Sequence, residues 1–318
     1  APLRWFKGNT HTHTLSSDGD SSAGEVTHWY RDHGYDFLCL SDHNYLTPVG
    51  DLQRELDRET LIPGAHPMLL IPAEEVTDGL PAEGASGTLH VNAFDLRGGA
   101  VAPQHGATVR EVIQRDVDAI AAAGALPMLN HPNYGWNIAA DDLAAVRGLR
   151  TIEIYNGHPG VHNLGDLAHP AVEALWDDLL TRGARVLGVA VDDTHDLRTW
   201  GPRACNPGRG WIVVRARELE AAQIRAAIER GDFYASTGVV LADVGRRAGG
   251  VFVKVAPEVD EGTRYTIDFV GPGGRVLETA PGVEADHAFA PGEDYVRVRV
   301  RSSLGERAWS QPFFLEAR

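Results

Sequence analysis

Two histidines separated by one residue are the first side chains along the chain whose types and spacing could do chemistry. His11 and His13 follow an apolar run at 5–8 that predicts a strand. Because residues i and i+2 of a strand point the same way, both imidazoles can reach one metal ion. A single pair of this kind is more often a surface feature, and the same holds for Asp193 and His195 taken alone. The pair indicates a metal site only if other ligand-type residues recur at the ends of the other predicted strands.

Such residues do recur, at the end of almost every strand that the sequence predicts. Apolar runs at 36–40, 68–72, 88–94, 125–129, 150–155 and 185–191 predict the other strands. The ligand-type residues in or just after the seven runs are His11, His13, Asp18, Asp42, His43, Glu74, Glu75, His90, His131, Glu153, Asp192, Asp193 and His195. Polar groups that are costly to bury have no structural reason to gather at separate strand ends. The pattern therefore favours a metal centre.

Helical patterns lie between these strands and must position them. They span 23–33, with Ser21 and Ser22 as capping candidates, 108–123, where Thr108 precedes Glu111 by three residues, 170–182 and 219–230. Alternating strands and helices predict an α/β protein with parallel strands, and seven such units fit a closed or nearly closed barrel. In such barrels the chemistry lies at the carboxyl ends of the strands, where the residues above are found.

The residue pattern changes near position 245. Short alternating runs at 251–255, 265–270, 275–279, 287–289, 295–301 and 307–315 are separated by turn signals. They predict a small antiparallel, β-sandwich-like domain over residues 243–318, after a barrel domain over residues 1–242. His287 stands alone in this part and is expected as a surface or core residue.

Composition limits the classes of partner. The net charge of −15 repels nucleic-acid phosphates, so no nucleic-acid partner is expected, and no apolar run approaches the roughly 18 residues of a membrane helix.

Cys39 and Cys205 form no zinc-binding CxxC pair, and a disulfide between them is the less favoured alternative. The start at Ala1 and Pro2 without an initiator Met favours a periplasmic or secreted chain, with a shortened chain as the alternative. The oligomeric state is left open.

The ligand-type residues, in this order, resemble those of the PHP (polymerase and histidinol phosphatase) superfamily of metal-dependent hydrolases. The matching motifs are the HxH pair with Asp18, Ser-Asp-His ending at His43, Glu75 after Pro-Ala-Glu, the single His90, His-Pro at His131, and Asp-Thr-His ending at His195. Together they cover residues 6–240. The resemblance implies a distorted (β/α)7 barrel, in agreement with the seven predicted strands.

The resemblance also implies how the ligands divide among the ions. His11, His13, Glu75 and Asp193 would hold one ion, Glu75 would bridge to a second held by His90 and His131, and Asp18, His43 and His195 would build a third site. Because Asp18 stands in place of a histidine, the resemblance leaves open two or three ions. Ligands of these types without cysteine suit Mn, Fe or Zn. Motif alignment selects Glu75 over Glu74 and Asp193 over Asp192, and the two unselected acids are expected behind the ligands or facing solvent.

The remaining site residues are predicted from their positions. Asp42 is expected to hydrogen-bond a ligand imidazole or to protonate the leaving group, and Asp193 and His195 join it as catalytic residues. The predicted substrate contacts are Lys7, His158, Arg203 and Arg209, each with a surface or loop role as its alternative.

Residues 7–13, and residues 208–216 with 231–238 and the β-rich tail, resemble the carbaryl-hydrolase-like (CehA/McbA-type) branch of the superfamily. This branch implies a stand-alone and often exported hydrolase, but it does not fix the substrate, which is expected to be a small-molecule ester. The first expectation is a phosphoesterase for a small mono- or diester, in which a metal-bridging hydroxide attacks phosphorus. The alternative is a carboxylic or carbamate ester hydrolase on the same site. A second alternative is a non-catalytic metal-binding or interaction protein.

Overall fold

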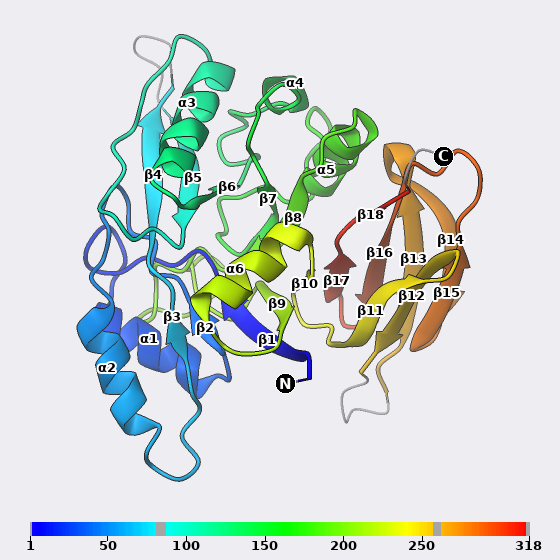
Figure 1. Cartoon of the computed structure of the whole chain (residues 1–318). Helices are drawn as coiled ribbons and strands as arrows, with labels where there is room; N and C mark the ends of the chain where they lie inside the picture. The colour runs from blue at the N-terminus through cyan, green and yellow to red at the C-terminus, as the bar shows by residue number, and fades with distance from the viewer. Residues whose placement is uncertain (1, 81–86, 257–261, 316–318) are drawn as a thin grey trace.

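The computed structural model describes residues 2–80, 87–256 and 262–315, and within them the chain is a mixed α/β protein (Figure 1). The first part of the chain contains β1 (Arg4–Asn9), α1 (Ala23–Asp32), β2 (Phe37–Leu38), α2 (Gly50–Glu59), β3 (Leu69–Leu70), β4 (Ala73–Gly79), β5 (Thr88–Phe94), α3 (Val109–Ala122), β6 (Leu126–Leu129), α4 (Ala140–Leu143), β7 (Thr151–Asn156), α5 (Val172–Thr181), β8 (Leu187–Val191), β9 (Trp211–Ala216), α6 (Ala221–Arg230) and β10 (Phe233–Ser236). The second part contains β11 (Leu241–Arg247), β12 (Gly250–Val255), β13 (Tyr265–Gly271), the 3-10 turn η1 (Pro272–Gly274), β14 (Arg275–Pro281), β15 (Glu284–Ala288), β16 (Tyr295–Ser302), β17 (Arg307–Ser310) and β18 (Phe313–Phe314). No described helix is long and apolar enough to cross a bilayer.

Two helices begin at the caps that the sequence predicts. The Ser22 hydroxyl accepts a hydrogen bond from the Glu25 backbone N–H, and the Glu25 carboxylate accepts one from the Ser22 N–H in return. Thr108 caps α3 through the Glu111 N–H. Helix α2 was not predicted, because it is largely charged and Leu52 and Leu56 are its only apolar side chains. Strand β4 was also missed, because its three acidic residues are typical of a loop.

The described residues form three sheets, whose antiparallel pairs correct the prediction of parallel strands, while the predicted distorted (β/α)7 barrel is not shown. The five-stranded sheet has the order β4-β5-β6-β7-β8, the ten-stranded sheet has the order β14-β13-β16-β17-β10-β9-β1-β2-β3 with β18 beside β16, and β11-β12-β15 form the third. Strand β5 runs antiparallel to both β4 and β6, and β9 runs antiparallel to β1. The connection from Gly79 to Thr88 is too short for the crossover of a dozen or more residues that a parallel pair needs. A regular alternation of strand and helix therefore does not form there.

The five-stranded and ten-stranded sheets meet through two single bridges, in which Glu75 lies within β4 and the other three residues lie beyond strand ends. Thr12 bridges Thr194 in parallel, and His43 bridges Glu75 in parallel. At the first bridge the His13 N–H donates to the Thr194 carbonyl at 2.9 Å. Because these bridges lie among the ligand-type residues, the backbone that joins the two sheets also fixes where those side chains stand.

The carboxy-terminal strands pack as two antiparallel layers, to the right in Figure 1. Val253 of β12, Phe269 of β13 and Val298 of β16 belong to one apolar core between the layers. His287 is buried in this part, with its ring nitrogens 2.9 and 3.1 Å from carboxylate oxygens of Glu278 and Glu293. The ten-stranded sheet crosses the predicted domain boundary at 242, because β10 pairs with β17. The division into two domains stays a prediction.

A buried ion pair ties β16 to α5. The Arg297 guanidinium is fully buried, and its Nε and Nη2 lie 2.8 and 2.6 Å from the two carboxylate oxygens of Asp177. The Tyr295 hydroxyl donates to the same carboxylate at 3.1 Å, and Glu173 contacts Arg297 at 2.8 Å. A bidentate, hydrogen-bonded pair of this kind compensates the cost of burying both charges.

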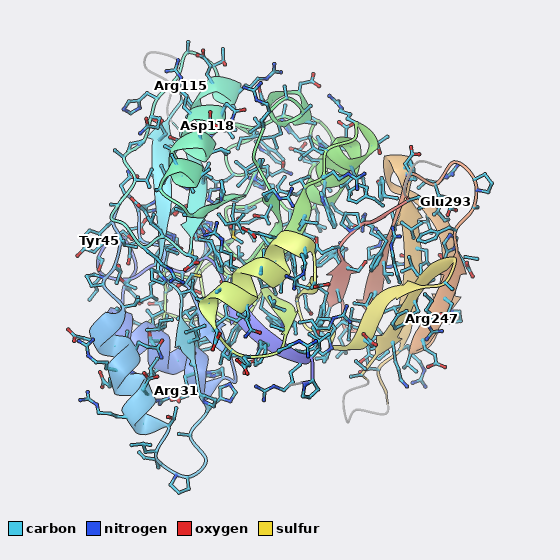
Figure 2. All side chains as sticks on the ribbon, in the orientation of Figure 1. Arg31, Tyr45, Arg115, Asp118, Arg247 and Glu293 are labelled. Carbon is cyan, nitrogen blue, oxygen red and sulfur yellow. The ribbon has the colours of Figure 1, made fainter. Side chains whose placement is uncertain are left out.

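Removing one partner of this pair should destabilise the fold strongly. Asp177→Ala should lower the free energy of unfolding by about 3 kcal/mol, because it leaves the buried Arg297 with Glu173 alone. Chemical denaturation measures the loss. The matched control is Asp286→Ala, which removes the exposed partner of Arg247 on β11 (Figure 2) and should cost far less. Equal losses in the two variants would contradict a stabilising role for the buried pair.

Candidate metal centre

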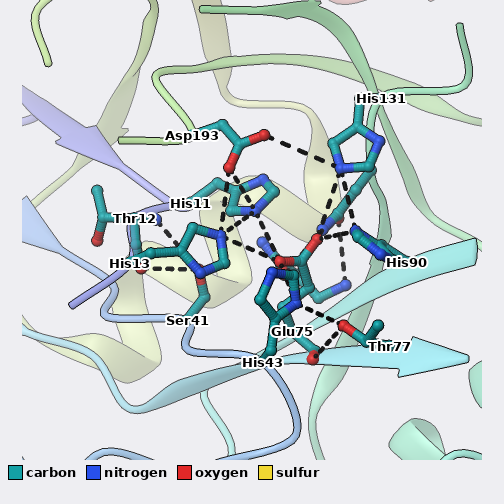
Figure 3. A network of polar contacts seen from close by, with 12 residues as sticks. His11, Thr12, His13, Ser41, His43, Glu75, Thr77, His90, His131 and Asp193 are labelled. Carbon is teal, nitrogen blue, oxygen red and sulfur yellow. Dashed lines mark hydrogen bonds and ion pairs between the residues drawn. The ribbon is translucent and has the colours of Figure 1, made fainter. Parts of the chain in front are cut away.

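Four side chains meet at the floor of the site, where the two sheets join (Figure 3). The His11 Nε2 atom lies 3.1 Å from His13 Nε2, 3.3 Å from Glu75 Oε2 and 3.2 Å from Asp193 Oδ1. The His13 Nε2 atom lies 3.1 and 3.2 Å from the same two oxygens. A tetrahedral ion with ligands at about 2.0–2.1 Å has edges roughly 3.3 Å long. The four atoms therefore stand where the corners of one coordination shell would be.

The hydrogen bonding of Glu75 tests the fit of a cation at this floor. Its Oε1 accepts from Asn130 Nδ2 at 2.6 Å, but its Oε2 is buried and accepts no hydrogen bond from any described residue. A buried carboxylate oxygen without a donor is costly unless a positive charge faces it. Two imidazole nitrogens and two carboxylate oxygens are a ligand set that Zn, Mn and Fe accept. The residues present fit a divalent ion.

A second group shares Glu75 with the first. The His90 Nδ1 atom lies 2.6 Å from Glu75 Oε1 and 3.2 Å from His131 Nε2, which lies 3.5 Å from the same oxygen. The two oxygens of Glu75 therefore face different groups of histidines. This is the bridging position that the resemblance implies, and carboxylates suit it because each oxygen can bind its own cation.

A third group lies at the mouth. The Asp18 carboxylate oxygens lie 3.4 Å from His43 Nε2 and 3.3 Å from His195 Nε2. The Asp18 side chain is 55% exposed, whereas those of His11 and His13 are fully buried. The cluster thus runs from a sealed floor to an open mouth, and it brings together all nine residues predicted as ligands. The number and identity of the ions stay predictions.

The cluster lines a cleft of about 350 Å³. The residues that line it are Asp18, His43, Glu75, Thr77, Thr88, His90, His131, Tyr134, His158, Asp193, His195 and Cys205. Cys39 and Cys205 are both free and buried, so no disulfide joins them. The opening gives a small molecule access to the cluster, as a catalytic metal site requires.

Glu153 holds His11 from behind, a role that the sequence did not reveal. Its Oε1 lies 2.6 Å from His11 Nδ1, and its Oε2 accepts from the His131 N–H at 2.7 Å and from Asn156 Nδ2 at 2.8 Å. A carboxylate that accepts a hydrogen bond from Nδ1–H directs the other ring nitrogen, Nε2, toward a metal ion. Glu153 belonged to the strand-end pattern, but nothing in its spacing indicated which histidine it would face. Thr77, whose hydroxyl lies 2.6 Å from His43 Nδ1, was missed in the same way.

The structure contradicts both roles predicted for Asp42. Its carboxylate is fully buried and accepts hydrogen bonds from the Thr14 N–H, the Ser17 hydroxyl and the Thr47 hydroxyl at 2.8, 2.7 and 2.5 Å. It contacts no ligand imidazole directly and does not line the cleft. Its place is under the loop that carries Asp18, and because that loop folds back over it, strand position alone could not reveal this anchoring.

Three of the four predicted substrate contacts lie away from the cleft. The Lys7 ammonium stands over the rings of Tyr35 and Trp211, 3.9 and 4.2 Å from their centroids, and burial lowers its pKa. The Arg209 guanidinium donates to the carbonyl oxygens of Gly157 and Gly201 and so fixes a loop. Arg203 is exposed and does not line the cleft. Only His158 stands in the cleft wall.

The two acids that motif alignment set aside are both buried, so solvent-facing positions are wrong for them. Asp192 accepts hydrogen bonds from three consecutive backbone N–H groups at 208–210, at 2.6 to 2.9 Å. Glu74 accepts from the Val101 N–H at 2.7 Å. Each therefore anchors a loop behind the site, while its neighbour, Asp193 or Glu75, faces the cluster.

Charges in the cluster shift pKa values in opposite directions. Burial alone would lower the pKa of His11 and raise that of Glu75, but the charges of Asp193 and Glu75 raise the His11 pKa well above its usual value. The histidines hold the Glu75 pKa well below its usual value. Burial also opposes the shift at His195, where a hydrogen bond to Asp18 and the charge of Asp193 raise the pKa to about 11. Protons and a cation therefore compete for the same nitrogen atoms.

No family model matches the chain, and none of the curated proteins matches it in sequence. Among solved structures it is similar to a two-domain protein from Bacteroides vulgatus that contains a predicted PHP-like metal-dependent phosphoesterase, with a TM-score of 0.49 and 19% identity over 94% of this chain and 90% of that one. It is also similar to a proposed metal-dependent phosphoesterase from Bifidobacterium adolescentis, with a TM-score of 0.39 and 16% identity over 59% of this chain and 87% of that one. A third similar structure is an amidohydrolase from Chromobacterium violaceum with bound sulfate, with a TM-score of 0.41 and 13% identity over 60% and 88% of the two chains. At these values the likeness carries no argument about activity, and the geometry of the site must carry it.

Removing the charge of Glu153 should weaken metal binding without removing a ligand. We expect Glu153→Gln to lower the affinity for Zn²⁺ or Mn²⁺ by about 10- to 100-fold, because His11 loses the carboxylate that orients it. Competition with a chromogenic chelator measures the affinity. The matched control is Glu74→Gln, which changes a buried acid that contacts Val101 and should leave the affinity unchanged. An unchanged affinity in Glu153→Gln would show that His11 needs no such support.

The gain in thermal stability from a bound divalent ion should increase as the pH rises from 6 to 9. Histidines whose pKa is raised in the fold stabilise it fully below the unfolded value near 6.5 and lose that contribution as pH rises through the folded value, about 11 for His195. Metal-free protein should therefore lose stability across this window, while metal-bound protein, with unprotonated ligand nitrogens, should not. Tm with and without Mn²⁺ at several pH values measures this. A metal-induced gain that shrinks with rising pH would contradict it.

Proposed function

We propose that the chain is a metal-dependent hydrolase of the PHP superfamily, in its carbaryl-hydrolase-like branch, and that it cleaves phosphoesters. The observation that carries this proposal is the floor of the cleft, where His11, His13, Glu75 and Asp193 place four ligand atoms within 3.1 to 3.3 Å of one another in every measured pair. Two further groups of ligand-type residues adjoin this floor, and the whole set follows the order of the PHP motifs.

The openness of the cluster supports catalysis over storage. A structural or storage site encloses its ion with protein ligands, whereas a catalytic site keeps a position open. Here the side chains of His43 and His195 are 24% and 17% exposed, and Asp18 at the mouth is more exposed still. A non-catalytic metal-binding protein would have no use for this opening.

Divalent ions held by these residues supply the Lewis acidity that activates water and neutralises a phosphoryl group. The protein's own part is to place and preserve the ligands. Glu153 holds His11 through Nδ1 so that Nε2 faces the floor, Asp42 fixes the loop that carries Asp18, and the buried floor excludes water from behind the cluster. Asp193 and His195, both in the cleft wall, remain the predicted catalytic residues, and Asp42 becomes a positioning residue.

A carboxylic or carbamate ester hydrolase is the second candidate. One observation favours it: among the described residues that line the cleft there is no lysine or arginine. An uncharged ester needs no cationic side chain for binding. The two candidates share the cluster and differ in the bond that breaks.

Protein loaded with Mn²⁺ or Zn²⁺ should hydrolyse bis(p-nitrophenyl) phosphate. We expect Asp193→Asn to lower kcat by about 100-fold or more, because it removes one of the four ligands at the floor. Asp286→Ala, on the carboxy-terminal strands, is the control and should keep the parent kcat. Release of p-nitrophenol measures the rate, with naphthyl carbamates and carboxylic esters assayed in parallel. Failure on every phosphoester with full metal loading would remove the first candidate, and cleavage of the carbon esters alone would establish the second.

A further inference from the structure

Apart from its histidines, the charged side chains of the cleft wall are all acidic. Its described lining holds three acids, Asp18, Glu75 and Asp193, and no lysine or arginine. Of the basic residues predicted as substrate contacts, Lys7 stands over two aromatic rings, Arg209 donates to backbone carbonyl oxygens, and Arg203 does not line the cleft. The chain as a whole has a net charge of −15. Apart from the histidines of the cluster and the cations that they would hold, no described residue of the wall offers a positive charge to an anion.

His158 offers the wall a neutral hydrogen-bond donor. Its Nδ1 accepts a hydrogen bond from the Gly160 backbone N–H at 2.9 Å, so Nδ1 carries no proton. In a neutral imidazole the proton must then be on Nε2. No described residue accepts a hydrogen bond from this Nε2 atom, and the ring stands edge-on to His195 and to Tyr134, with centroids 5.6 and 5.7 Å apart. The Gly160 contact thus fixes both the tautomer and the orientation of the ring.

An aromatic side chain stands beside the ligands in the cleft wall. Tyr134 lines the cleft with its ring centroid 5.1 Å from that of His131, and it is 38% exposed. An exposed aromatic ring in the wall of a cleft suits a substrate that itself carries an apolar group.

We propose that the cleft selects a singly charged phosphodiester with an apolar or aromatic ester group over a doubly charged phosphomonoester, with the Nε2–H of His158 donating to a phosphoryl oxygen and Tyr134 packing against the ester group. This inference rests on the function proposed above. A monoester spreads two charges over three terminal oxygens, and the oxygen that faces the wall meets only neutral donors, which offset less charge than a lysine or arginine does. In a diester that position belongs to an ester oxygen and its organic group, which an aromatic wall accommodates.

The chemistry is one hydrolysis. The oxygen of water forms the new P–O bond, one P–O ester bond breaks, one proton of the water goes to the leaving oxygen, and the other stays with the phosphate product. That product is a monoester whose second ionisation lies near pH 6, so at neutral pH it carries the second charge that the wall does not match. The reaction should therefore stop after one ester bond.

Product counting with metal-loaded protein tests this directly. Bis(p-nitrophenyl) phosphate should yield one equivalent of p-nitrophenol while p-nitrophenyl phosphate accumulates, and kcat/KM should be at least about 10-fold higher for the diester than for the monoester. Binding gives a readout without turnover. By calorimetry, diphenylphosphinate, a singly charged ion that cannot be hydrolysed, should bind more tightly than the doubly charged phenylphosphonate at pH 8.

Variants of the wall separate selectivity from general damage. Tyr134→Arg should shift the kcat/KM ratio toward the monoester by about 10-fold, because it adds a charge at the wall, while Tyr134→Phe keeps the ring and should keep the ratio. His158→Ala should lower kcat/KM for the diester, and His158→Asn, which retains a neutral N–H donor, should restore part of it. A merely structural role for His158 would leave Asn no better than Ala.

The outcomes are distinguishable. Release of two equivalents of p-nitrophenol, or a monoester rate equal to the diester rate in the parent protein, would overturn this inference and leave the phosphoesterase function standing. Tighter binding of phenylphosphonate would overturn it as well. Cleavage of no phosphoester would overturn the proposed function itself. If Tyr134→Arg fails to fold, the parent protein's product count and calorimetry still decide the question.

Discussion

The structure depends on one electrostatic constraint, which is that carboxylates are buried against each other and need positive charge beside them. Glu75 and Asp193 both stand within 3.3 Å of the same two histidine nitrogens at the buried floor of the cleft. Histidines that carry protons can balance these charges, and divalent ions balance them more completely. Several surrounding contacts hold these carboxylates and histidines in positions where a cation balances the carboxylate charges. Glu153 fixes His11, Asn130 holds one oxygen of Glu75, and the bridges between the sheets fix the backbone on both sides.

The paired acids show how strand geometry meets this constraint. Consecutive residues of a strand face opposite sides, so Glu74 and Glu75 of β4 send one carboxylate to the floor and the other behind it. Asp192 and Asp193, just beyond the end of β8, divide in the same way. The second acid of each pair, Glu75 or Asp193, holds the cluster, while Glu74 and Asp192 accept backbone N–H groups from loops that pass behind the site. Asp193 has a φ of 53°, in the left-handed region, where side chains other than glycine are uncommon. Such a backbone is retained where surrounding contacts over-determine it, as the cluster does here.

These same features explain what the sequence could and could not predict. Most strand positions and the gathering of ligand-type residues at strand ends follow from alternation and from residue type, both of which are local properties, whereas the choice of the nine ligands came from the resemblance to the PHP motifs. Strand β5 runs antiparallel to β4 because the connection between them is short, and β4 itself was missed because its acidic residues are typical of a loop. The role of Asp42 depends on a loop folding back over it, and that of Lys7 on two aromatic rings distant in sequence. A side chain's face can be inferred from its own strand, but what lies against that face is set by tertiary contacts.

The distribution of cationic side chains completes the argument. Arg297 and Arg299 hold the carboxy-terminal strands to α5 through Asp177 and Glu173, and Arg209 ties together the loops behind His158. Basic groups are thus placed at structural junctions and kept out of the cleft wall, so bound ions would be the main positive charges that a substrate meets. The same ions would supply the counter-charge for the floor. The stability of the floor and the attraction of an anionic substrate then depend on the same cations. A basic residue added at the floor would balance the buried carboxylates, but it would occupy the position where a metal ion would bind the substrate.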